Sequence, residues 1–172
     1  MRWPLSIAAL AIVAATAAIA VPRTPDSAAQ QPGGRTITLF ESGRGGTFRL
    51  VDHPPRSPVA NAESPRARFS LGDQGFWTGL ILDRRGGSRI GRVYGAETVM
   101  SGSRFPNVIN VVHATFKLHE GQIVVEAVVD ERHPERVRAA VLGGTGAYEG
   151  ARGTFTTKPG ARGNEDTIAL LP

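Results

Sequence analysis

Short runs of β-branched and aromatic residues, separated by turns that contain glycine, fill the chain from residue 36 to its C-terminus. Two of these runs, TITLFE (36–41) and TFRLVD (47–52), flank SGRGG, a five-residue connection typical of a β-hairpin. No segment of this region has the apolar spacing of an amphipathic helix. The sequence therefore predicts eight or nine strands, with the further runs at 67–83, 88–102, 108–120, 122–130, 136–144, 151–158 and 166–172.

The connections between these runs are too short for parallel neighbours, which need a crossover of about a dozen residues. Antiparallel strands joined in this way favour an up-and-down barrel or a sandwich. Closure into a barrel removes the edge strands that invite aggregation. The predicted fold class is therefore all-β, as an eight-stranded antiparallel up-and-down β-barrel of the calycin-like kind. Residues 53–65, which hold four of the twelve prolines, are predicted to form a long loop.

The N-terminal residues indicate export. An arginine precedes an alanine-rich apolar run that ends in the A-x-A sequence Ala18-Ile19-Ala20, the pattern of a secretory signal peptide over 1–20. The alternative is an uncleaved anchor, because residues 4–21 approach the length that spans a bilayer. Residues 21–35 are rich in Pro, Ser, Gln and Gly and predict a disordered linker, so that the folded domain occupies 36–172. We expect a secreted or extracytoplasmic protein that contacts a membrane only if the first segment is uncleaved.

Composition excludes several kinds of site. The chain has no cysteine, which removes disulfides, thiol nucleophiles and thiolate metal sites. Its four histidines lack the spacing of metal ligands, so that no metal and no cofactor is expected. The net charge is +5, but the arginines that dominate the basic residues are scattered among acids, which does not indicate a nucleic-acid partner.

Three segments in order, SLGDQGFWTGLILD (70–83), SRIGRVYGAETVM (88–100) and AVLGGTGAYEGARGTF (140–155), resemble the barrel shared by allene oxide cyclases and plant dirigent proteins. The resemblance covers roughly residues 36–172. It implies an eight-stranded barrel with a hydrophobic cavity that steers a reactive lipid-derived or phenolic intermediate into one stereochemical product. It also implies a homo-oligomer, commonly a dimer or a trimer.

The glycines of the third segment are expected to be structural. Gly143, Gly144, Gly146 and Gly150 permit positive φ angles and close backbone approach at a barrel corner. A phosphate-binding loop is the alternative, but the spacing is one residue too long for the dinucleotide fingerprint and a strand follows where a helix should begin.

The resemblance implies a set of cavity-lining positions. Matched backwards from the RGG turn, the Glu and the Asn that the family carries on its first strand fall at Thr38 and Phe40. The Asn expected after the GD pair falls at Gly79, and the aromatic residue two positions earlier is Trp77. The Tyr of a later strand falls near Val129. Only the aromatic residue is kept, so that the original cyclase reaction with its original residues is not expected.

Glu97 stands where the family carries a Cys, and it is the candidate catalytic residue. If the strand keeps the family's facing, period-two alternation points Val93, Glu97 and Val99 into the barrel. Desolvation would then raise the pKa of Glu97 and make it a usable general acid or base. A register difference of one residue would instead turn Glu97 to solvent. We hypothesise that Glu97 transfers a proton or orients the ligand.

The predicted function is that of an exported barrel that binds a hydrophobic small molecule and guides its stereoselective isomerisation or cyclisation. If the protein is an enzyme, it is an isomerase or cyclase of the allene oxide cyclase type with altered active-site residues. The alternatives are a non-catalytic carrier of the calycin type and a structural secreted barrel.

Overall fold

The computed structural model describes residues 34–52 and 68–172, so that the predicted signal peptide, most of the linker and the predicted loop at 53–65 lie outside the described residues. The described chain forms strands almost throughout. The elements are β1 (Arg35–Val51), β2 (Gln74–Leu82), β3 (Arg89–Arg104), β4 (Asn107–Leu118), β5 (Gly121–Asp130), the 3-10 helix η2 (Pro134–Arg136), β6 (Arg138–Gly146), β7 (Gly153–Gly160) and β8 (Gly163–Leu170).

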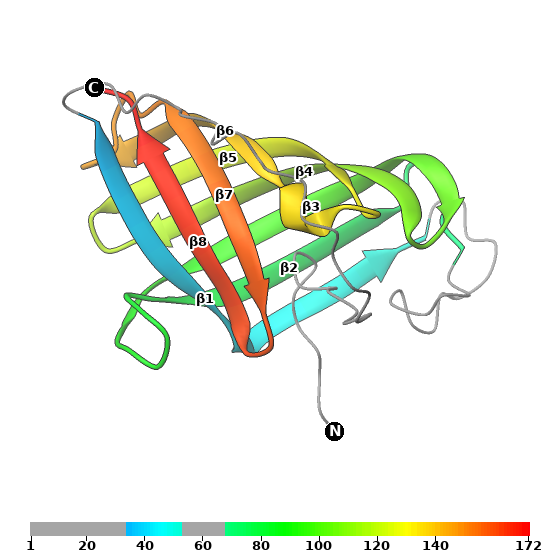
Figure 1. Cartoon of the computed structure of the whole chain (residues 1–172), viewed down its shortest axis with the longest axis horizontal. Coiled ribbons are helices and arrows are strands. Elements are labelled where there is room, and N and C mark those ends of the chain that lie inside the picture. Colours follow the sequence, from blue (N-terminus) through cyan, green and yellow to red (C-terminus); the bar gives the residue numbers. More distant parts are fainter. Residues whose placement is uncertain (1–33, 53–67) are drawn as a thin grey trace, which may run out of the picture.

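The eight strands close into one antiparallel barrel in chain order, as Figure 1 shows. Closure is made by β1 and β8, which pair from Arg35↔Leu170 to Ser42↔Gly163. The predicted eight-stranded antiparallel barrel is confirmed. No helix of the described residues is long and apolar enough to cross a membrane.

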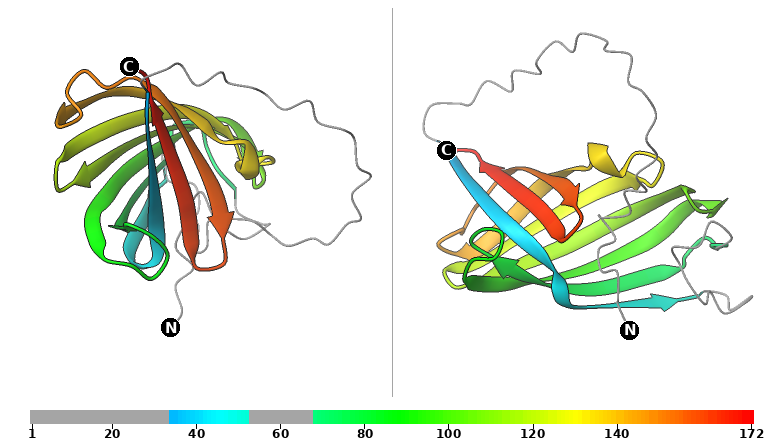
Figure 2. Two further views of the ribbon diagram at one scale, coloured as in Figure 1. Left: turned by 60° about the vertical axis from the view of Figure 1, so that its left-hand side comes forward. Right: turned by 60° about the horizontal axis from the view of Figure 1, so that its bottom comes forward.

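The predicted hairpin between residues 36–41 and 47–52 is wrong, because both runs belong to the single strand β1. A bulge between Ser42 and Thr47 bends this strand, and both halves pair with β2. Gly45 has a φ of 75° there, and a side chain at Gly46 would collide with the carbonyl oxygen of Thr78. These glycines therefore let β1 turn a sharp corner against β2 instead of reversing direction, which the right-hand view of Figure 2 shows.

Inward side chains fill one part of the barrel with an apolar core. Leu39, Ile81 and Ile168 are at most 2% exposed. The ring of Phe116 packs against that of Phe155, with centroids 5.4 Å apart. Alternate residues face outward, as expected for strands whose two faces meet core and solvent.

The glycines near the β6–β7 connection have the predicted structural environment in part. Gly146 and Gly150 have φ angles of 63° and 73°, which favour glycine. A side chain at Gly144 would collide with backbone oxygens of Gln122 and Tyr148. Gly143 is less restricted, since only the Arg152 side chain comes near its absent Cβ, at 3.6 Å.

Candidate functional site

A cavity of about 70 Å³ lies inside the barrel. Its wall is mainly apolar and combines inward residues of seven strands with Pro134 and Val137 of the β5–β6 connection. Three polar side chains border it: Glu41 of β1, Glu131 just after β5, and Thr157 of β7. The apolar lining residues on the strands are Trp77, Val93, Val112, Ala114, Phe116, Val125, Ala127, Val129, Ala139 and Phe155.

Glu131 belongs to a buried hydrogen-bonded group with Asn110 and Glu97. The amide Nδ2 of Asn110 donates to Glu131 Oε1 at 2.9 Å and to Glu97 Oε2 at 3.4 Å. The three residues are between 5% and 9% exposed. Asn110 therefore joins two carboxyl groups, one of which borders the cavity while the other lies behind it.

Burial controls the protonation of this pair. Desolvation raises the pKa of Glu97 to about 8, and the nearby charge of Glu131 adds to the effect. Desolvation also raises the pKa of Glu131 to about 7, although the hydrogen bond from Asn110 opposes the rise. Near neutral pH this pair consequently contains both a protonated acid, which can donate, and a carboxylate, which can accept.

A second buried polar group contains Glu41, Asn164, Asp166 and Thr157. The amide Nδ2 of Asn164 donates to Glu41 Oε2 at 3.2 Å. Asp166 pairs with Leu39 on one side and with Thr157 on the other in the strand ladders, and it is 1% exposed. Within the described part of the chain, Asn164 Oδ1 has no hydrogen-bond partner, and Thr157 is the hydroxyl group that favours the charged form of Asp166.

Burial sets the charge state of the second group. Burial raises the pKa of Asp166 to about 8, with a further contribution from the charge of Glu41. Burial also raises the pKa of Glu41, against the hydrogen bond from Asn164. The cost of burial outweighs the hydrogen bond from Thr157, so that the protonated form of Asp166 is favoured near neutral pH. The cavity therefore has acid–base groups on two sides of an apolar wall.

Of the five predicted cavity positions, two line the cavity and three do not. Trp77 and Val129 line the cavity. Gly79 lies on the inner face, where a side chain would collide with Glu41, but it is not a lining residue. Thr38 and Phe40 do not line the cavity: Thr38 is exposed, and the exposed Arg85 lies over the Phe40 ring with its guanidinium carbon 5.5 Å from the ring centroid.

The placement of Thr38 and Phe40 in the cavity is thus corrected, for a reason of parity. Leu39 belongs to the core cluster and Glu41 borders the cavity, so that the two odd-numbered residues point inward. The match was counted back from the RGG sequence as though it formed a regular turn. The register shift of β1 between Ser42 and Thr47 falls at that sequence, so that a regular count across it gives the wrong parity for the residues before it.

Glu97 faces the interior, as the alternation of β3 indicates, but it is not a lining residue of the cavity. It contacts the cavity group only through Asn110. Sequence reasoning missed Glu41, Asn110, Glu131 and Asp166. Each stands two positions from a buried apolar residue of the same strand or its end, and this period-two signal would have found them.

The described residues hold no cluster of three or more His, Asp or Glu side chains suited to a metal ion. The acid–base groups instead occur as two carboxyl pairs, each with an asparagine amide beside it.

Comparison with solved structures shows the same fold in proteins of several activities. The chain is similar to a pyocyanin demethylase (19% identity, TM-score 0.60, 80% of this chain and 100% of the other). It is similar to a pterocarpan synthase dirigent protein (15% identity, TM-score 0.58, covering 80% of this chain and 93% of the other). It is also similar to an exo-specific intermolecular Diels-Alderase (16% identity, TM-score 0.54, 80% and 97%).

The sequence matches no protein-family profile and no curated protein. The resemblance to dirigent and cyclase barrels is therefore confirmed at the level of the fold. What this chain does has to be argued from its own site.

Proposed function

We propose that the barrel binds a hydrophobic small molecule in its interior and guides an isomerisation or cyclisation of that molecule by proton transfer. The observation that carries the proposal is that Glu41 and Glu131 border one apolar cavity, each next to a second buried carboxyl group. A Diels-Alderase and a dirigent pterocarpan synthase with the same fold support the reaction class.

The chemistry needs one proton acceptor and one proton donor on the same bound molecule. In the isomerisation of a β,γ-unsaturated ketone, a carboxylate removes the proton between the carbonyl group and the double bond. A carboxylic acid then delivers a proton to the far carbon of the double bond, so that the oxidation state is unchanged. Glu131 suits the acceptor role because its pKa of about 7 leaves it partly ionised at neutral pH. Glu41 suits the donor role because burial raises the pKa of its carboxyl group, and Asp166 lies behind it as a second buried acid.

The size of the cavity limits the ligand. About 70 Å³ is less than the roughly 300–1,000 Å³ of sites that enclose drug-sized molecules. We therefore expect the cavity to hold a single small ring or the reacting end of a longer molecule. Because Pro134 and Val137 border the cavity from outside the strands, we place its entrance beside η2.

A small β,γ-enone, 3-cyclohexenone, is a direct probe of this reaction class. Its conversion to the conjugated 2-cyclohexenone is followed by ultraviolet absorbance. We expect the wild-type protein to accelerate the conversion and Glu131→Gln to lower the rate by about a hundredfold, since general acid–base groups contribute about 10²–10⁴. Glu165→Gln, which removes an exposed carboxylate of β8, is the control. Equal rates for Glu131→Gln and the wild type would contradict the proposal.

Glu97 is, in this scheme, a positioning residue that acts through Asn110 on Glu131. Glu97→Gln should shift the alkaline side of the pH–rate profile, because it removes the negative charge that Glu97 acquires above its pKa of about 8, while keeping an oxygen acceptor for the Asn110 amide. A Glu97→Gln variant with full activity and an unchanged pH profile would remove Glu97 from the mechanism.

A matched pair of variants tests whether the cavity holds the ligand. Val129 lines the cavity, whereas the adjacent Val128 is 69% exposed. Val129→Phe should abolish the quenching of Trp77 fluorescence by 3-cyclohexenone, and Val128→Phe should leave it unchanged. Saturable quenching without turnover would assign the protein to the alternative class of carriers.

We further propose that the barrel works outside the cytoplasm as a homo-oligomer. The signal-peptide pattern of residues 1–20 supports export, and N-terminal sequencing of the protein from its host's exported fraction tests it. Native mass spectrometry of the same material measures the number of subunits.

A further inference from the structure

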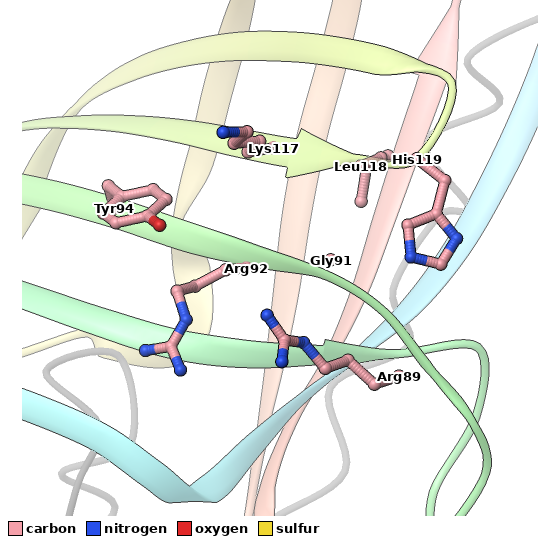
Figure 3. A pocket seen from close by; sticks show the side chains of 7 residues that line it. All are labelled: Arg89, Gly91, Arg92, Tyr94, Lys117, Leu118 and His119. Atoms are coloured by element: carbon pink, nitrogen blue, oxygen red, sulfur yellow. The ribbon is translucent and has the colours of Figure 1, made fainter.

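A hollow on the outer surface of the barrel lies over β3 and β4. It has a volume of about 340 Å³, within the range of sites for small molecules. Four of its lining residues carry basic side chains: Arg89, Arg92, Lys117 and His119. Figure 3 shows the two guanidinium groups below Gly91 and the Lys117 side chain above it.

A bulge in β3 brings the two arginines to the same face. Ile81 pairs with Gly91 but Leu82 pairs with Arg89, so that Ile90 is one residue extra on β3. Ile90 packs against the core, and Arg89 is exposed. Without the extra residue, strict alternation from the outward Arg92 would put Ile90 in solvent and Arg89 inside the barrel.

The positive charges of the hollow have no acidic partners among the described residues. The ion pairs of the described chain use Arg35, Arg84, Arg132, Arg136, His113 and His133. Arg92 Nη1 donates only to the Thr78 hydroxyl, at 3.3 Å. Three permanent positive charges therefore surround one concavity without an acidic partner among the described residues, and they would attract an anion.

The remaining lining gives the anion an apolar neighbour. The Tyr94 side chain is 46% exposed at the side of the hollow, and Leu118 borders it as well. Gly91 contributes no side chain, so that the floor is backbone. A flat ring can stack on Tyr94 while a forked anionic group accepts from Arg89 and Arg92.

We propose that this outer hollow binds a small molecule that joins an aromatic or other flat apolar group to a phosphate or sulfate. The guanidinium groups of Arg89 and Arg92 hold the anionic oxygens, Lys117 adds charge, and Tyr94 contacts the ring. The site is separate from the interior cavity, with which it shares no lining residue.

Isothermal titration calorimetry with 4-nitrophenyl phosphate tests the proposal, with 4-nitrobenzyl alcohol as the neutral counterpart. Arg92→Gln and Lys117→Gln remove charges of the hollow, and Arg138→Gln removes an exposed charge on β6 as the control. We expect one saturable site for the phosphate, at least about tenfold weaker in Arg92→Gln, as for the loss of a charge-assisted hydrogen bond. Lys117→Gln should weaken phosphate binding less than Arg92→Gln does. Arg138→Gln should bind the phosphate as the wild type does, and 4-nitrobenzyl alcohol should not bind.

Three results would overturn the proposal. The first is the absence of saturable binding of 4-nitrophenyl phosphate. The second is an equal loss in Arg138→Gln, which would show general attraction of anions to a basic protein. The third is sedimentation with phosphatidylglycerol vesicles that depends on Arg92 while the soluble phosphate does not bind, which would identify a membrane surface instead. The interior variant Val129→Phe should bind the phosphate normally, so that this test is independent of the proposed function.

Discussion

A Glu97→Gln variant is expected to gain stability over the wild-type barrel as the pH is raised. Burial raises the pKa of Glu97 from 4.5 to about 8 in the folded protein. Between these values the folded chain keeps a proton that the unfolded chain has released. Folding stability therefore falls as the pH rises through this window and levels off above the folded pKa.

The size of the effect follows from the separation of the two pKa values. Each pH unit in the window costs about 1.4 kcal/mol, which gives about 3 kcal/mol at pH 7 and at most about 5 kcal/mol above pH 8. Gln cannot ionise, and its amide oxygen still accepts from Asn110. Glu97 is 9% exposed, and the remaining contact with water lowers the cost of its charge. We therefore expect the variant to gain about 2–5 kcal/mol in the free energy of unfolding at pH 8 and above, and to change little near pH 4.

Urea unfolding followed by the fluorescence of Trp77, repeated across this pH range, measures the difference. Glu165→Gln is the control, because that carboxylate is exposed on β8. The other buried carboxyl groups lower the stability of both proteins with pH, so that only the difference between the two curves belongs to Glu97. Parallel curves for the wild type and Glu97→Gln would refute the argument that burial of Glu97 costs the folded state its charge.

Two further pairs of variants test the fold. Gly146→Ala should destabilise the barrel by more than the roughly 1–2 kcal/mol that a left-handed backbone costs an alanine, since the new side chain would also collide with a backbone oxygen. Gly86 has a φ of 70° and open space around it, so that Gly86→Ala should cost only the backbone strain. Thermal unfolding of the two variants measures the difference. Phe116→Ala should cost about 3–5 kcal/mol in urea unfolding and the exposed Phe76→Ala less than about 1 kcal/mol, and similar losses would contradict the assigned facing of β2 and β4.

The regular part of the barrel could be predicted from sequence because its strands alternate strictly. In β3, the buried Val93 and Val99 set the parity that points Glu97 inward, and the structure shows this facing. The prediction failed where a bulge changes the parity. Glu41 was missed because the bulge of β1 follows it and looks like a hairpin turn in the sequence. The outer hollow was missed because a second bulge re-aims Arg89.

Pairings across the barrel lie outside what local patterns encode. Asn110 and Glu131 are 21 residues apart, and no spacing rule connects them, yet the Asn110 amide binds the Glu131 carboxyl. Glu131 lies in the turn that follows β5, where a strand pattern ending at 130 does not look for an inward residue, yet its side chain is buried. Asp166, the buried carboxyl group in the same polar group as Glu41, comes from β8, far along the chain from Glu41 on β1.

The pairing of the first strand with the last has a consequence for how the chain folds. Asn164 and Glu41, which meet in the closed barrel, are 123 residues apart in the sequence. The seam can form only after β8 has left the ribosome, and until then β1 and β7 are open edges. Such long-range pairing predicts slow folding, in milliseconds to seconds, with a late step that buries Glu41 and Asp166 together. The acid–base cavity is thus completed by the last strand to be made.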